Sequence, residues 1–209
     1  MNELAVLQQR IVSCGLCPRL IDHCRHIARL KRRAYLDQEY WGKPVPSFGD
    51  PNARLLILGL APGAHGANRT GRMFTGDKSG VFLYRALYET GFATTIDGRE
   101  LKGAYITASA HCAPPDNKPT REELANCRPY LEQELKLLKN VKVVVALGRI
   151  AFDTYLTITG QKAKFGHHAV HNFSPILIAS YHPSQQNTST GRLTAEMLRE
   201  VFETASRHT

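Results

Sequence analysis

Four short apolar runs, each followed by a segment with helical periodicity, constrain the fold of this chain most strongly. The runs cover residues 54–59, 104–108, 142–147 and 175–180. The helical segments that follow them cover residues 79–90, 120–139, 148–158 and 192–205. Alternation of a buried strand with a helix is typical of a parallel sheet that has helices on both faces. The sequence therefore predicts an α/β fold, and its length favours a single domain over residues 1–209.

The segment before this alternation is basic and contains a pair of cysteines. Residues 3–12 show helical periodicity, and a second, basic helix is predicted over about 19–38. The stretch 41–52, WGKPVPSFGDPN, is rich in proline and glycine and predicts a loop that leads into the first strand.

Three connections follow strand ends: residues 59–77, 108–119 and 181–191. Ligands of open parallel sheets bind at the carboxyl ends of strands, so we expect these connections to converge. The first of them, Gly59 to Asp77, reads GLAPGAHGANRTGRMFTGD. Its glycines allow close approach of the backbone to a ligand, and its arginines favour an anion. A loop of this length in a compact domain is more often functional than not.

The connection after the last strand is polar. It reads SYHPSQQNTSTGRLT over residues 180–194, and its hydroxyl and amide side chains suit phosphate contacts. Its histidine, His182, is a candidate catalytic group because it lies on a strand-end loop opposite the glycine-rich one. A lone histidine is, however, more often an ordinary surface or core residue. His167, His168 and His171 are less specific, since a surface loop explains them.

Five cysteines are present, and four of them have a spacing that suits a metal centre. Cys14 and Cys17 are two residues apart and precede a proline, Cys112 follows a strand, and Cys127 lies in a predicted helix. Four thiolates fit zinc or an iron–sulfur cluster, and the spacing does not choose between them. The alternative is that these are buried apolar cysteines. Cys24 is left over, on a helix, where packing explains it.

Charge and composition narrow the class of protein. The chain has 27 Lys and Arg against 18 Asp and Glu, a formal charge of +9, which suits a polyanion such as nucleic acid and is equally compatible with a role in solubility. An apolar fraction of 43% without a run of eighteen apolar residues is typical of a soluble globular protein. The first residues lack the layout of a signal peptide, so we expect an intracellular protein.

These motifs together resemble the uracil-DNA glycosylase superfamily, and within it the iron–sulfur enzymes of family 5, or type B. The resemblance rests on GLAPGAHGANRTGRMFTGD, on HPSQQNTSTGRLT, on the four cysteines and on APPDNKPT at 113–120. These pieces occur in the family's order and span residues 14 to 194, which makes the resemblance far more specific than a single glycine-rich loop.

The resemblance implies a three-layer α/β/α sandwich around a four-stranded parallel sheet. It also implies a 4Fe–4S cluster held by four cysteines, which are Cys14, Cys17, Cys112 and Cys127. Members of this family flip a damaged base out of DNA and hydrolyse its N-glycosidic bond, leaving an abasic site. The implied partner is damaged, uracil-containing duplex DNA, with single-stranded DNA as the alternative. We expect a monomer that works near the nucleoid in the cytoplasm of a prokaryote.

The chemistry assigns roles to two residues. Cleavage of a glycosidic bond builds positive charge on the sugar and negative charge on the departing base. Asp77 is the candidate carboxylate that orients water and offsets the first charge, and His182 is the candidate group that stabilises the leaving base. Asp77 has a competing role as the N-cap of the helix that begins near Ser79, and both roles are compatible.

Further residues are assigned to the base and to the DNA backbone. Phe74 matches the aromatic residue that stacks on the base, although ordinary core packing explains it nearly as well. The other candidates for base binding are Gly59, Ala61, Gly63 and Asn117. The candidates for DNA binding are His65, Arg69, Arg72, Ser184, Asn187 and Arg192.

The chain departs from related families at three positions. Family 1 has an acidic residue where this chain has Ala61, and family 4 has a glutamate at Leu60 and an asparagine at Ala108. Family 5 shares these absences and accepts a wider set of bases, including hypoxanthine. A pocket without a dedicated amide is expected to discriminate less sharply.

Two other functions are compatible with parts of the sequence. A non-catalytic nucleic-acid-binding protein with a structural or redox-sensing cluster explains the cysteines and the charge but gives no shared role to Phe74, Asp77 and His182. A phosphoester hydrolase is disfavoured because the glycine-rich loop lacks the Walker spacing and no acidic cluster offers a magnesium site. A DNA glycosylase gives every motif a role.

Overall fold

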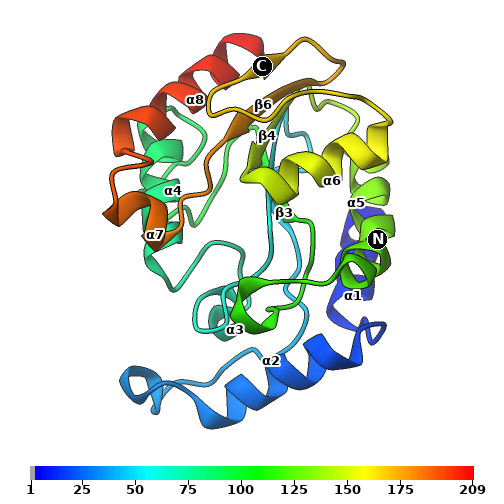
Figure 1. Cartoon of the computed structure of the whole chain (residues 1–209), viewed down its shortest axis with the longest axis vertical. Helices are drawn as coiled ribbons and strands as arrows, with labels where there is room; N and C mark the ends of the chain where they lie inside the picture. Colours follow the sequence, from blue (N-terminus) through cyan, green and yellow to red (C-terminus); the bar gives the residue numbers. More distant parts are fainter. Residues whose placement is uncertain (1–2) are drawn as a thin grey trace.

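The computed structural model describes residues 3–209, which form a six-stranded sheet covered by helices (Figure 1). The strands are β1 (Phe48–Gly49), β2 (Leu55–Gly59), β3 (Ala104–Ala108), β4 (Val143–Leu147), β5 (Val170–His171) and β6 (Ile176–Ser180). Their order across the sheet is β1-β3-β2-β4-β6-β5.

The four central strands, β3, β2, β4 and β6, are parallel, as predicted. The prediction of a purely parallel, four-stranded sheet is incomplete, because β1 and β5 pair antiparallel at the two edges and make the sheet mixed. Each of these edge strands has two residues. A strand of that length is too short to show an alternating or continuous apolar pattern, so the sequence carries no signal for it.

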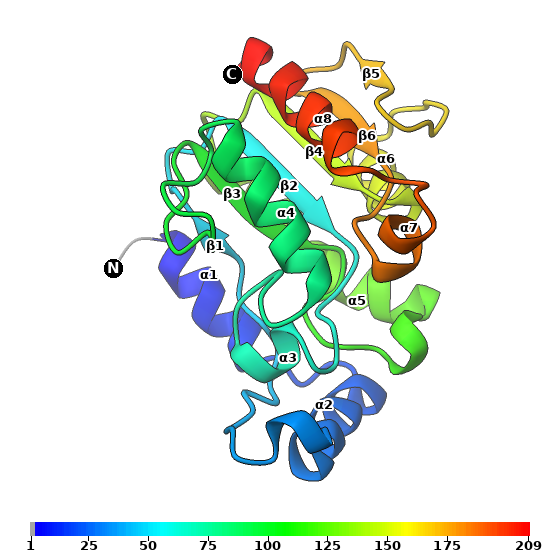
Figure 2. The same cartoon turned by 90° about the vertical axis from the view of Figure 1, so that its left-hand side faces the viewer.

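Helices cover both faces of the sheet. They are α1 (Glu3–Val12), α2 (Pro18–Leu30), α3 (Ala67–Thr70), α4 (Lys78–Glu89), α5 (Arg121–Leu137), α6 (Arg149–Thr159), α7 (Gln185–Ser189) and α8 (Ala195–His208), with 3-10 turns η1 (Arg33–Tyr35) and η2 (Pro115–Asn117). Figure 2 shows α4 and α8 side by side over one face of the sheet. None of the helices in residues 3–209 has the length and apolar character needed to cross a membrane.

Alternate residues of the central strands pack into two different apolar cores. In β2, Leu55 and Ile57 belong to the core shared with α4 and α8, whereas Leu56 and Leu58 belong to the core shared with α1, α5 and α6. Because side chains point to opposite faces in turn along a strand, a run that is apolar at every position must be buried on both faces. This explains why the four apolar runs identified the central strands.

The predicted basic helix over 19–38 is wrong in its extent. Helix α2 ends at Leu30, where Lys31 adopts a left-handed backbone (φ 53°) and its N–H donates to the carbonyl of Ile27. The chain then turns through η1 and runs back toward the sheet. In Figures 1 and 2, α2 lies at one end of the molecule, near α3.

The register of the sheet brings the strand ends together. Gly59 of β2 lies opposite Ala108 of β3, and Leu147 of β4 lies opposite Ser180 of β6. The connections that follow β2, β3 and β6 therefore leave from the same edge, as the sequence predicted.

Candidate active site

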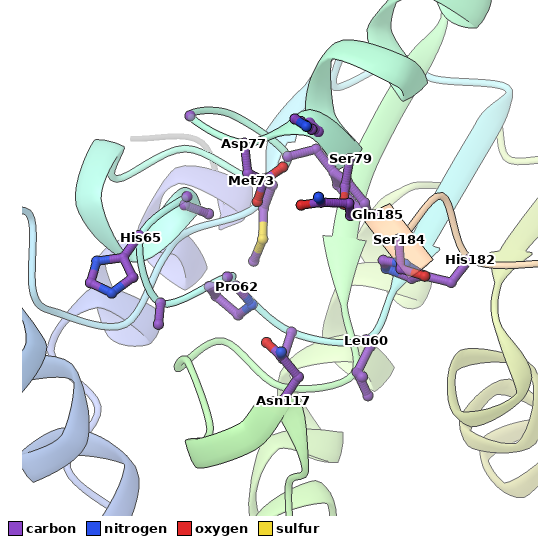
Figure 3. A pocket seen from close by; sticks show the side chains of 18 of the residues that line it. Leu60, Pro62, His65, Met73, Asp77, Ser79, Asn117, His182, Ser184 and Gln185 are labelled. Carbon is purple, nitrogen blue, oxygen red and sulfur yellow. The ribbon is translucent and has the colours of Figure 1, made fainter. Parts of the chain in front are cut away.

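A cavity of about 950 Å³ lies at this edge, and residues of all three strand-end connections line it. The glycine-rich loop contributes Leu60–Ala67 and several residues from Met73 onward, η2 contributes Asp116 and Asn117, and the last loop contributes His182 and Ser184–Gln186. Figure 3 shows Asp77, His182 and Asn117 on different sides of this cavity. The convergence predicted from the sequence is therefore confirmed.

Most of the residues predicted for catalysis, base binding and DNA binding line the cavity, and five of them do not. Those that line it are Ala61, Gly63, His65, Phe74, Asp77, Asn117, His182 and Ser184. Those that do not are Gly59, Arg69, Arg72, Asn187 and Arg192. Leu60 and Ala108, the positions at which family 4 differs, both line the cavity, so these departures fall within the site itself.

The carboxylate of Asp77 is fixed between a helix end and two glycines. Its Oδ1 accepts a hydrogen bond of 2.9 Å from the N–H of Gly80 and thereby caps α4. Its Oδ2 lies against Gly63 and Gly66: a Cβ at Gly63 would be 2.9 Å from this oxygen, and one at Gly66 would clash with it. Both glycines also line the cavity. The glycines of this loop thus make room for the carboxylate at the cavity wall.

Burial is the main influence on the charge of this carboxylate. It raises the pKa of Asp77, while the N–H groups of Gly80 and Ser79 and the charge of Arg69 lower it. The competing role of N-cap is confirmed, and the same side chain remains at the wall of the cavity.

Phe74 adopts a left-handed backbone conformation, with φ of 54°. This conformation is rare for a bulky side chain and costs on the order of 1–3 kcal/mol, so the surrounding structure must hold it in place. Gly59 lies under the ring, where a Cβ would come within 2.9 Å of it, and Gly80 packs against the Phe74 carbonyl too closely for any side chain. The ring stacks on His182, with 6.0 Å between centroids. Gly59 thus supports the site indirectly, beneath Phe74.

His182 carries a neutral imidazole at neutral pH. Burial lowers its pKa to about 4. Asn187 holds the backbone of this residue, since its Nδ2 donates to the His182 carbonyl at 2.8 Å. Within residues 3–209, neither ring nitrogen of His182 has a hydrogen-bond partner. A neutral imidazole with a free N–H can donate to an oxygen that becomes negative during a reaction.

His65 is oriented by a short hydrogen-bond chain. The N–H of Arg32 donates to the Tyr40 hydroxyl (3.3 Å), which in turn pairs with Nδ1 of His65 (3.0 Å). Burial, followed by the charges of Arg32 and Arg69, lowers the pKa of His65. The hydroxyl that accepts from Arg32 can donate to Nδ1, which leaves the proton of a neutral His65 on Nε2.

Arg69 and Arg72 are held by the protein in different ways. Arg69 donates to the His65 carbonyl, to Gln38 and to the Gly76 carbonyl, and it stacks on Tyr35 at 3.9 Å. The guanidinium of Arg72 lies 4.4 Å from the ring of Phe48 and donates to one carbonyl, that of Gly98. Arg69 therefore ties the glycine-rich loop to the segment after α2.

The remaining polar residues organise the last loop. Ser184 caps α7 by accepting from the N–H of Asn187, and it lines the cavity. Arg192 is exposed and lies over the ring of Tyr181 at 4.6 Å.

The structure adds cavity residues that the sequence did not single out. Arg32 and Tyr35 come from the turn after α2, and Gln185 and Gln186 come from α7. The sequence analysis missed Arg32 and Tyr35 because the helical pattern gave no sign that the chain reverses at Lys31. The glutamines lie directly after His182-Pro183-Ser184, and this proximity was the only signal for them.

The four cysteines predicted to bind metal come from three separate segments. Cys14 and Cys17 lie in the turn between α1 and α2, Cys112 follows β3, and Cys127 is on α5. Burial is the main cause that raises the pKa of Cys17 and Cys127, and a hydrogen bond with Cys24, followed by burial, raises that of Cys112. The charge of Cys14 adds a smaller rise to all three, so these sulfurs influence one another. Within residues 3–209, no three Cys, His, Asp or Glu side chains are arranged to hold a single metal ion.

Hydrogen-bond donors surround these thiols. The N–H of His111 donates to Sγ of Cys127 (3.3 Å), Asn126 donates to Sγ of Cys17 (3.6 Å), and Tyr130 hydrogen-bonds to Cys14. Burial raises the pKa of Cys127 to about 12. Thiols with donors aimed at sulfur are suited to bind metal as thiolates, because those donors stabilise the ionised sulfur.

Cys24 lies on α2, buried beside Cys112, with its Sγ 3.7 Å from the carbonyl of Ala113. It is packed in a small apolar cluster with Leu20 and Ala113. Cys24 also hydrogen-bonds to Cys112, so its contacts include a predicted cluster ligand as well as apolar neighbours.

The fold and the site define a class of protein: the chain belongs to the uracil-DNA glycosylase superfamily, whose family model matches residues 46–206. Within the superfamily it groups with the type-5 members. It is 50% identical to the type-5 uracil-DNA glycosylase of Thermus thermophilus, over 95% of both chains.

Two relatives from one organism show that the chain is more similar to a type-5 enzyme than to a type-4 enzyme. The chain is 46% identical to the type-5 uracil-DNA glycosylase of Pyrobaculum aerophilum, over 94% of this chain and 89% of the relative. It is 29% identical to the type-4 uracil-DNA glycosylase of the same organism, over 78% of this chain and 69% of the relative. This difference agrees with the resemblance to family 5.

Proposed function

We propose that this chain, a type-5 uracil-DNA glycosylase, removes uracil from DNA with Asp77 and His182 as its catalytic residues. The observation that carries this assignment is the geometry of one cavity, in which a fixed carboxylate and a neutral imidazole with unpaired ring nitrogens occur together. The activity is the hydrolysis of an N-glycosyl bond in base-excision repair.

The flipped nucleotide enters the cavity at the ends of β2, β3 and β6. Phe74 stacks on the base, and Asn117 supplies an amide at the opposite wall. Gly59, Ala61 and Gly63 shape the wall of the base pocket. Extrusion of the base costs a few kcal/mol, which contacts to the DNA backbone must offset.

The bond between the sugar and the base breaks with its electron pair moving to the base. His182 donates its N–H to the base oxygen on which the negative charge accumulates. Asp77 stabilises the positive charge on the sugar, orients a water molecule toward its anomeric carbon and accepts a proton from that water. The base leaves as an anion that takes a proton from solvent, and an abasic site remains.

The cavity has apolar or small residues where related families place an acidic residue and an amide. Ala61, Leu60 and Ala108 offer no hydrogen bond from a side chain to the edge of a base. We propose that this chain accepts other deaminated or modified bases besides uracil, including hypoxanthine, because its pocket does not depend on one specific amide contact.

We also propose that Cys14, Cys17, Cys112 and Cys127 hold a 4Fe–4S cluster. Three of these four thiols, those of Cys14, Cys17 and Cys127, have an N–H or O–H donor directed at sulfur, which supports this donor set, and thiolates bind such clusters. When bound, the cluster would tie the turn between α1 and α2 to α5 and to the segment after β3. No step of the reaction passes through it.

Contacts to the DNA backbone are assigned to His65, Arg69, Arg72, Ser184, Asn187 and Arg192. The formal charge of +9 supports a polyanionic partner, and binding is expected to weaken steeply with salt. We propose that the protein acts on uracil-containing duplex DNA as a monomer in the cytoplasm.

The direct test is a glycosylase assay on duplex oligonucleotides that carry uracil, hypoxanthine or another modified base. The expected product is an abasic site, formed without added metal, with uracil and at least one other lesion as substrates. Tight binding without excision would overturn the catalytic assignment and favour a non-catalytic DNA-binding protein.

A metal analysis of the same preparation tests the cluster. The protein purified in air is expected to be brown and to contain about four irons per chain. Colourless protein with one zinc per chain would contradict the cluster.

A further inference from the structure

A second cavity of about 370 Å³ lies next to the base pocket. Phe74, Gly76 and Val81 line both cavities, so the two are neighbours on either side of these residues. The other lining residues are Thr70, Arg72, Thr75, Tyr84, Asp97 and Arg99.

The charged groups of this second cavity leave one cation unpaired. Arg99 forms an ion pair of 2.7 Å with Asp97, whereas no carboxylate in residues 3–209 lies within ion-pair distance of Arg72. Arg72 is partly buried and lies over the ring of Phe48. A partly buried charge without a counter-charge is costly, so this site favours an anion.

The guanidinium of Arg72 is fixed but has donors to spare. The described part of the chain offers two acceptors to its five N–H groups, the carbonyl of Gly98 and the hydroxyl of Tyr84. Gly98 packs against Tyr84 too closely for any side chain, which holds that carbonyl in place. The hydroxyl of Thr75 donates to the Arg72 carbonyl at 2.9 Å and fixes its backbone. Arg69, by contrast, donates to protein oxygens through all three of its nitrogens.

We propose that the second cavity is a phosphate subsite, in which Arg72 binds the phosphodiester of a nucleotide adjacent to the excised one. The planar fork of arginine suits two oxygens of a phosphate, and the phosphates of the substrate are the anions nearest to the base pocket. The inference rests on the proposed function, because it takes the first cavity to be the base pocket. In this role Arg72 positions the strand and does not contact the reacting atoms.

Methylphosphonate scanning combined with Arg72→Gln tests the subsite. Uracil oligonucleotides are made with one uncharged methylphosphonate at a time, on either side of the uracil, and kcat/KM is measured with the wild-type protein and the variant. We expect R72Q to lower kcat/KM about tenfold on native DNA and to reduce the salt dependence of binding by about one phosphate contact. We expect no further loss from R72Q on the one oligonucleotide that lacks the contacted charge.

Arg85→Gln is the matched control, since Arg85 is exposed on α4, pairs with Glu89 and lines neither cavity. It should leave kcat/KM unchanged. If R72Q does not fold, Arg72→Lys serves instead. This variant keeps the positive charge, and therefore the salt dependence of binding, but lacks the planar guanidinium. Its decrease in kcat/KM must also be absent on the oligonucleotide that lacks the contacted charge.

Losses from R72Q that are equal on every oligonucleotide, with an unchanged salt dependence, would overturn the subsite. That result would leave the proposed function intact, because the wild-type protein would still excise uracil. A wild-type protein that excises nothing would overturn the proposed function itself.

Discussion

The two catalytic candidates lie on loops that hold their side chains by different physical means. In the loop after β2, the carboxylate of Asp77 and the ring of Phe74 occupy space that Gly59, Gly63 and Gly66 leave free. In the loop after β6, a hydrogen bond from Asn187 holds the backbone of His182. A side chain that is held by close packing cannot shift without a clash. A single hydrogen bond contributes only about 1 kcal/mol to the stability of a conformation, and one substitution can remove it. Substitutions in the two loops should therefore differ in size and in kind.

Apart from replacement of Asp77 itself, the largest effect is expected from His182→Ala. Removal of one donor to a developing negative charge lowers the rate by roughly 10²–10³. The hydrogen bond from Asn187 goes to the backbone of residue 182, so the loop should keep its conformation. Single-turnover excision of uracil measures the loss. A rate within threefold of the wild type would remove His182 from the mechanism.

The next effect tests steric placement. In Gly63→Ala the new methyl group meets Oδ2 of Asp77 at 2.9 Å, and its other neighbours are 3.8 Å or more away. The carboxylate must move, and a misplaced catalytic group costs roughly 100-fold in rate. DNA affinity and the melting temperature should change little.

Gly166→Ala is the control for this prediction, because a methyl group there meets only Ala169, at an ordinary distance of 3.7 Å. Equal activities of the two variants would show that the close approach of Gly63 does not position the carboxylate.

A smaller effect should follow from loss of the hydrogen bond in the second loop. Asn187→Ala removes the donor to the His182 carbonyl, and a net contribution of about 1 kcal/mol corresponds to nearly tenfold in rate. Thr190→Ala removes a hydrogen bond within the same short helix without touching His182, and its rate should match that of the wild type. If the two variants lose equal activity, the effect belongs to the helix and not to the histidine.

The smallest effect concerns pH. Burial lowers the pKa of His182 to about 4, so its charge does not change near pH 6.5, where an ordinary histidine titrates. Burial raises the pKa of Asp77, so the active carboxylate is lost as the pH falls, and at a higher pH than for an exposed aspartate. Single-turnover rates should fall at the acid end without a step near pH 6.5. A step at that pH which disappears in His182→Ala would contradict the neutral imidazole.

The sequence predicted the central sheet because β2, β3, β4 and β6 are buried on both faces and are apolar at nearly every position. It also predicted which loops converge, since parallel strands end at one edge. It missed β1 and β5, which have two residues each, and the reversal after α2 at Lys31. These features depend on tertiary contacts and leave no periodic signal.

The site shows a similar division. The residue types of Asp77, His182 and the four cysteines suggested their chemistry from the sequence alone. From the sequence, the glycines of the first loop predict that the backbone approaches a ligand closely. The structure adds that Gly63 and Gly66 face the Asp77 carboxylate, a relation between residues more than ten positions apart that no local pattern encodes.

The role of Asp77 is tested most directly by Asp77→Asn in single-turnover excision measured beside DNA affinity. Asparagine caps a helix as well as aspartate does, so α4 should remain intact. We expect excision to slow by roughly 10²–10⁴ while the Kd for uracil-containing DNA stays within a few-fold of the wild-type value. A folded Asp77→Asn protein that excises uracil at the wild-type rate would contradict a catalytic role for this carboxylate.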